Sequence, residues 1–101
     1  MEIMEELTFI ESLAADVAPR NLSVQQKSLW YFKKGDWQTA HDLIDHLQDP
    51  ISCHVHAFLH RVEGDQPNAR YWYNRAGKPF YQADIEQEWQ ELAKEYVFNA
   101  L

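Results

Sequence analysis

The chain has 101 residues, 46% of them hydrophobic, and a formal net charge of −7. This length accommodates one domain, residues 1–101, and is too short for two. We expect no nucleic-acid partner, because contacts to phosphates need a broad basic surface that an acidic chain does not provide.

The cellular location is inferred from three simple features. Cys53 is the only cysteine, so no disulfide can form within the chain, and a reducing compartment is favoured. Residues 1–6 are acidic and lack the basic and apolar regions of a signal peptide. No apolar run approaches the ~20 residues that span a bilayer. The sequence therefore predicts a cytoplasmic protein without a membrane segment.

Apolar residues recur at helical spacing, and no useful stretch alternates with a period of two, which predicts an all-α fold. The first helix is expected over residues 4–17 and ends before Pro19, since a residue that precedes proline disfavours helical dihedrals. The last helix is expected over residues 82–98, with four glutamates on a solvated face: Glu86, Glu88, Glu91 and Glu95. We expect these two helices to cap the helices between them.

Two helical hairpins are predicted between the terminal helices, over about 23–48 and 50–77. The pattern Gly-Asp-x-x-x-Ala begins at Gly35 and again at Gly64, 29 residues later. A repeat of this length is typical of stacked helical hairpins. Each glycine is expected to take the positive φ of a helix C-terminus, and each following aspartate to cap the next helix.

The second hairpin resembles the tetratricopeptide-like repeats. Five residues lead from Gly64 to Ala69, four more to Tyr73 and three more to Ala76, which is the small-residue spacing of that motif. The first copy keeps the glycine and the first alanine but has aliphatic residues at the last two positions. The resemblance covers residues 24–79 and implies about six helices that form a binding scaffold.

A narrower resemblance is carried by two blocks, HAFLHRVEGD at 56–65 and NARYWYNRAG at 68–77. They are similar to a family of small bacterial and fungal helical proteins that has no assigned activity. This resemblance supports a distinct family and implies no chemistry.

The helix expected over residues 50–63 has two faces that both suit packing. One face is apolar, and the other carries Cys53, His56 and His60, with Glu63 at its edge. His56 and His60 lie one turn apart, as metal sites on helices require. Ligands on one straight helix cannot converge on a tetrahedral ion, so a metal site would need His41 or His46 from a neighbouring helix. The alternative is a pair of packing histidines that are hydrogen-bonded to a tyrosine or a carboxylate.

The next helix could complete a small polar pocket beside these histidines. In this hypothesis Arg75, together with His60 or Arg61, would hold an anion. In the alternative, Arg75 forms a structural ion pair with Glu63 or with a C-terminal carboxylate. The candidate ligand-binding residues are His56, His60, Arg61, Glu63, Asn68, Tyr71 and Arg75.

These features favour a non-catalytic binding module for a peptide, a protein or a small anionic ligand, with no cofactor and no metal. The alternative is a small enzyme or a metal-binding protein that uses His56 and His60. Self-association is a further candidate, because Trp30 and Tyr81 are expected to be exposed.

Overall fold

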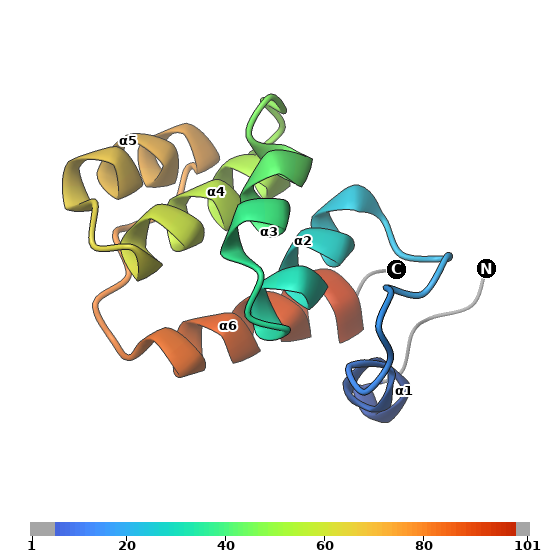
Figure 1. The fold of residues 1–101 in the computed structure, drawn as a ribbon. Helices are drawn as coiled ribbons and strands as arrows, with labels where there is room; N and C mark the ends of the chain where they lie inside the picture. Colours follow the sequence, from blue (N-terminus) through green and yellow to red (C-terminus); the bar gives the residue numbers. More distant parts are fainter. Residues whose placement is uncertain (1–5, 99–101) are drawn as a thin grey trace.

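Six α-helices, followed by one π-helical turn, make up the part of the chain that the structure describes (Figure 1). The structure is a computed structural model that describes residues 6–98, with side-chain environments from residue 8 onward. All regular structure in this range is helical, as the sequence predicts. The elements are α1 Glu6–Ser12, α2 Val24–Lys33, α3 Trp37–Ile44, α4 Pro50–Val62, α5 Gln66–Ala76, α6 Ile85–Ala93 and the π-turn η1 Lys94–Phe98.

The repeated Gly-Asp corner joins α2 to α3 and α4 to α5. Gly35 has φ +87° and Gly64 has φ +86°, the left-handed conformation that glycine adopts without strain. The following residues, Asp36 and Asp65, cap the next helices by accepting hydrogen bonds from backbone N–H groups three residues later. Both corners are therefore confirmed in conformation and in capping.

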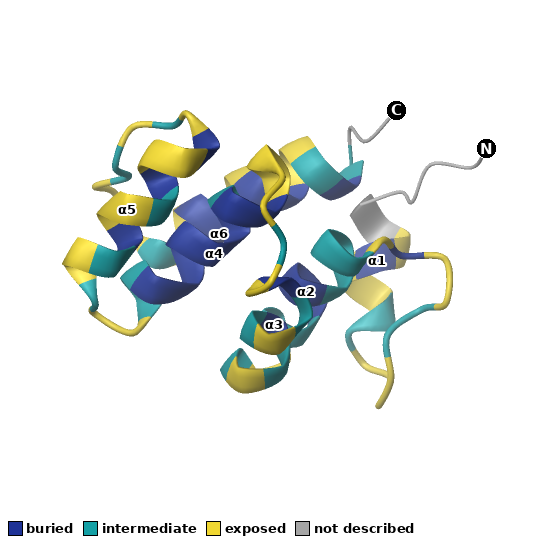
Figure 2. Cartoon of the chain, turned by 90° about the horizontal axis from the view of Figure 1, so that it is seen from above, coloured by how far each residue is buried: buried dark blue, intermediate teal, exposed yellow. Residues whose placement is uncertain are grey.

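Helix α4 lies at the centre of the molecule and is packed on two sides. Residues 55–60 are all buried, as the dark blue band along α4 shows (Figure 2). Helix α5 packs along one side of α4, while α2, α3 and α6 contact it elsewhere. Phe58 and Leu59 join the main core, which also contains Trp89 and Leu92 of α6. The prediction that this helix is covered on both sides is confirmed.

The terminal helices are shorter than the sequence predicts. Helix α1 ends at Ser12 instead of residue 17, because the Ser12 hydroxyl donates to Phe9 O and accepts a hydrogen bond from Trp30 Nε1. Residues 4 and 5 of the predicted helix lie outside the described residues. Helix α6 begins at Ile85 instead of residue 82, because Asp84 is its N-cap and accepts from Glu86 N.

Two aromatic residues that were expected at the surface are held by the protein itself. Trp30 is fully buried, so its expected exposure is wrong. Tyr81 is partly buried and donates its hydroxyl hydrogen bond to Glu91. Of the two aromatic residues named for self-association, only Tyr81 remains partly accessible. None of the helices in the described part of the chain has the length and apolar character needed to cross a bilayer.

Candidate functional site

Three histidines from two helices converge at the junction of the hairpins. His41 comes from α3, and His56 and His60 come from successive turns of α4. His41 Nε2 lies 3.1 Å from His56 Nε2. One ring nitrogen from each of the three lies within 4.8 Å of the other two. We call these residues the histidine cluster.

Carboxylates lie behind the outer two members of the histidine cluster. His60 Nδ1 is 2.6 Å from Glu63 Oε1. His41 Nδ1 lies 3.8 Å from carboxylate oxygens of Asp42 and of Asp45. His41 therefore turns Nε2 to His56 and Nδ1 to the aspartates. The Glu63 carboxylate lies within hydrogen-bond distance and orients the His60 imidazole, whereas 3.8 Å at His41 is too long for a hydrogen bond.

The middle residue, His56, has no such support. It is 4% exposed, and its Nδ1 atom has no hydrogen-bond partner among the residues that the structure describes. Burial, together with the neighbouring rings of His60 and His41, lowers the pKa of His56 to about 4, whereas Asp45 opposes the shift. The ring is therefore neutral at pH 7, which is the form that binds a metal.

Two tryptophans enclose the histidine cluster. The Trp37 ring is stacked on His41, with centroids 4.8 Å apart and an interplanar angle of 10°. The Trp72 ring is stacked on His56 at 4.0 Å. Trp37 is fixed in this position because its Nε1 donates to Leu59 O at 2.8 Å. The sequence reasoning did not assign either indole to a site.

The residues expected to line an anion pocket are engaged with other partners. The Asn68 side chain donates to Asp65, the cap of its own helix. Tyr71 is 51% exposed and accepts a hydrogen bond from Arg75 at 3.0 Å. Arg75 also donates to Gln48, so the expected ion pair with Glu63 is not formed. The Trp72 ring, which is stacked on His56, also lies close to Arg75, whose guanidinium carbon is 5.5 Å from the ring centroid.

Arg61 belongs to a second buried network, which fastens α6 to the hairpin α4–α5. Its Nε donates to Glu88 Oε1 at 2.8 Å, and the Tyr73 hydroxyl donates to Glu88 Oε2 at 2.5 Å. Glu88 is only 1% exposed, so its predicted place on a solvated face is wrong. Burial raises the pKa of Glu88, while the hydrogen bonds from Tyr73 and Arg61 act in the opposite direction.

The remaining chemically versatile side chains lie apart from the histidine cluster. His46 is the other residue proposed as a metal donor, but its side chain is 70% exposed and its nearest partner is Asp45. Cys53 is fully buried, and its Sγ donates to Gln48 O at 3.5 Å. His54 bonds through Nδ1 to the Tyr96 hydroxyl at 2.7 Å.

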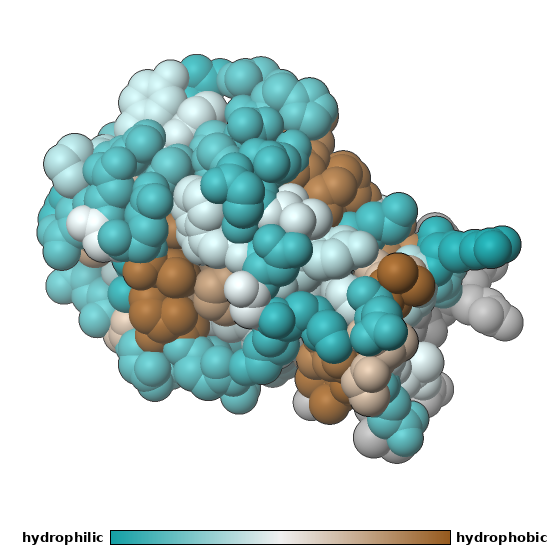
Figure 3. All heavy atoms as spheres, viewed as in Figure 1, coloured by the Kyte–Doolittle hydropathy of each residue, from teal (hydrophilic) through white to brown (hydrophobic). Residues whose placement is uncertain are grey.

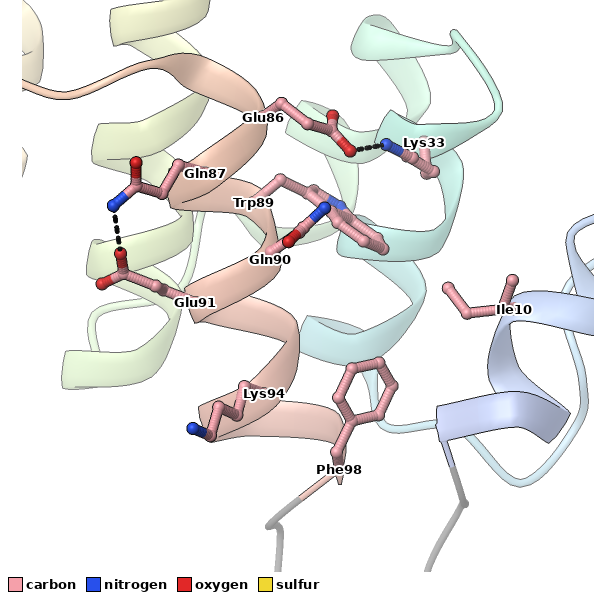
Figure 4. Close-up of a pocket in the computed structure, with 9 residues that line it drawn as sticks. All are labelled: Ile10, Lys33, Glu86, Gln87, Trp89, Gln90, Glu91, Lys94 and Phe98. Carbon is pink, nitrogen blue, oxygen red and sulfur yellow. Dashed lines mark hydrogen bonds and ion pairs between the residues drawn. The ribbon is translucent and has the colours of Figure 1, made fainter.

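A separate groove of about 560 Å³ runs between α1, α2 and α6 (Figure 4). Trp89, Phe98 and Ile10 supply its apolar surface, and the ion pair between Lys33 and Glu86 lies at its rim. The apolar surface on the face in Figure 3 forms separate patches between hydrophilic side chains.

Comparison with protein-family models, with curated proteins and with solved structures finds no match to this chain. The two resemblances described above therefore depend on the residues that carry them. The candidate site depends on its geometry.

Proposed function

We propose that this protein binds one transition-metal ion through His41, His56 and His60. The observation that carries the proposal is the mutual approach of three imidazole nitrogens within 4.8 Å, across two helices. Tetrahedral Zn²⁺ with Zn–N bonds of about 2.0–2.1 Å places its nitrogens about 3.3 Å apart. The separation of 3.1 Å between His41 and His56 is close to that value.

The donor set limits the metal. Imidazole nitrogen suits Zn²⁺, Cu²⁺, Ni²⁺ and Fe²⁺, whereas Ca²⁺ and Mg²⁺ require oxygen ligands. Glu63 behind His60 supplies the outer-shell support that ligating histidines usually have. This arrangement favours the metal-binding alternative over the leading hypothesis from the sequence, because α3 provides the donor that α4 alone lacks.

A packing role for the histidine cluster leaves one buried polar atom unpaired within the described part of the chain. A hydrogen bond between His41 Nε2 and His56 Nε2 uses one proton and leaves His56 Nδ1 without a partner in its buried place. Such an unpaired polar atom costs about 1–3 kcal/mol. Metal binding at Nε2 leaves Nδ1 unpaired as well, so the proposal depends on the convergence of the three rings and not on this atom.

The test is a zinc titration of metal-free protein against a chromophoric chelator. We expect one tightly bound Zn²⁺ per chain and no competition from Ca²⁺ or Mg²⁺. Replacement of His41, His56 or His60 with glutamine should each remove tight binding. His46→Gln is the matched control, since His46 lies close in the chain but is 70% exposed and outside the cluster. Circular dichroism would show that each variant is folded.

Two results would overturn the proposal. One is a folded wild-type protein that binds no zinc, copper or nickel. The other is zinc binding that is lost equally in His46→Gln and in the cluster variants, because that pattern would indicate adventitious sites.

We also infer that the two hairpins are a tetratricopeptide-like pair, supported by the shared Gly-Asp corner and by the central position of α4. Binding of a peptide or protein, expected from such repeats, stays a prediction, as does the cytoplasmic location. The groove in Figure 4 is a surface on which such a partner would dock. Its rim carries both lysine and glutamate, so it favours no charge sign in the partner.

A further inference from the structure

We infer that the metal ion bound by the histidine cluster keeps one coordination position for a small anionic ligand from solvent. This inference rests on the proposed function, because it concerns the same ion. It adds an exchangeable fourth ligand and the chemical class of that ligand.

The histidine cluster provides three ligands, not four. Among the described residues, the group of metal-binding side chains that contains all three histidines includes no carboxylate and no thiolate. The only cysteine donates to a backbone carbonyl of residue 48. His54 is bonded to Tyr96. Sites with three protein ligands complete their tetrahedron with water or substrate, whereas structural zinc sites are closed by four.

The nearby carboxylates lie next to the Nδ1 atoms of His60 and His41. Glu63 contacts His60 at Nδ1. Asp42 and Asp45 lie near His41 Nδ1. For Glu63 to bind the ion, it would have to leave its 2.6 Å contact with His60 and thereby remove the support of that ligand.

Charge favours an anion at the free position. Three neutral imidazoles leave both positive charges of a divalent ion uncompensated in the first coordination shell. The shell is also partly buried, which strengthens attraction between opposite charges. Four carboxylates weaken this attraction: Asp42 and Asp45 lie beside His41 Nδ1, Glu63 contacts His60 Nδ1, and Asp65 lies near His60 and Glu63.

The surroundings restrict the ligand to a small one. The stacked indoles of Trp37 and Trp72 cover the rings of His41 and His56. His41 is the most exposed member of the cluster, with 18% of its side chain accessible, compared with 9% for His60. Access from solvent is therefore on the His41 side and suits an anion of a few atoms.

The test uses the Co²⁺-loaded full chain, because Co²⁺ reports its coordination by visible absorption. We expect the intense bands of a four-coordinate ion, which shift on addition of azide and saturate at one azide per cobalt. Arg75→Gln is the control for anion binding at the surface, since Arg75 is exposed and lies close to the Trp72 indole. It should leave the azide titration unchanged.

The outcomes separate the two proposals. If wild type binds neither zinc nor cobalt, both the proposed function and this inference are wrong. If cobalt binds at one equivalent but azide leaves the spectrum unchanged, the site is closed and only this inference is wrong. A response to azide that appears in Glu63→Gln but not in wild type would show that Glu63 fills the fourth position, which also overturns the inference.

Discussion

Replacement of Glu88 with alanine is expected to destabilise the fold strongly. The substitution removes the acceptor of the Tyr73 hydroxyl and of Arg61 Nε, both inside the interface between α6 and the hairpin α4–α5. A buried hydroxyl without its partner costs about 1–3 kcal/mol. Removal of one member of a buried ion pair costs about 3–5 kcal/mol. Because Arg61 remains 13% exposed, we expect a total of about 3–5 kcal/mol.

Glu86 provides the matched control on the same helix. Its carboxylate also pairs with a cation, Lys33, but the two side chains are 53% and 30% exposed. An exposed ion pair contributes about 0–1 kcal/mol, so Glu86→Ala should change stability little. Glu88→Gln should lose less stability than Glu88→Ala and more than Glu86→Ala, because the glutamine amide oxygen can still accept a hydrogen bond from Arg61.

The assay is urea unfolding followed by circular dichroism. A loss of 3–5 kcal/mol is a large fraction of the roughly 5–15 kcal/mol of a typical domain. It should lower the urea midpoint with an unchanged slope, which identifies a loss of stability without a change in the surface exposed on unfolding. The reasoning is refuted if Glu88→Ala costs no more than Glu86→Ala.

Three further predictions use the same variants or single substitutions. Gly64→Ala should cost about 1–2 kcal/mol from its positive φ alone, since no atom lies within 4 Å of the added Cβ. Gly64→Asn should destabilise the protein less than Gly64→Ala, because asparagine adopts a positive φ more readily. If urea unfolding gives the same loss of stability for both variants, the cost is not purely conformational. Burial raises the pKa of Glu88 above 4.5, so the stability of wild type relative to Glu88→Gln should be greatest below pH 4.5 and fall as the pH rises through the folded pKa. Unfolding at several pH values measures this, and a constant difference would contradict it. Glu63→Gln should weaken zinc binding by about 10–100-fold without changing its stoichiometry, and unaltered affinity in the chelator titration would exclude Glu63 as the support of His60.

The helical corners could be predicted because their causes are local. A positive φ at Gly64 and a cap at Asp65 depend on residues within one turn, and the sequence places these types together twice. The end of α1 could not be predicted in the same way. It depends on a hydrogen bond between Ser12 and Trp30, 18 positions apart.

Only part of the candidate site could be predicted from the sequence. His56 and His60 stand out because they share one face of one helix. The choice between His41 and His46 requires the packing of α3 on α4, which the spacing within either helix does not determine. The structure brings His41 to the pair and leaves His46 exposed.

The burial of Glu88 was predicted wrongly for a different reason. Its position, three residues after Ile85 and four before Leu92, matches the apolar stripe of α6. The acidic residues around it favoured a solvated face instead. Hydrogen bonds from Tyr73 and Arg61, which are distant in the sequence, compensate the energetic cost of burying this carboxylate.

X-ray absorption at the zinc edge of the one-to-one zinc complex tests the central claim most directly. We expect three imidazole nitrogens at about 2.0–2.1 Å and one further light atom. A sulfur neighbour at about 2.3 Å, or a shell of oxygens without imidazole scattering, would contradict binding by His41, His56 and His60.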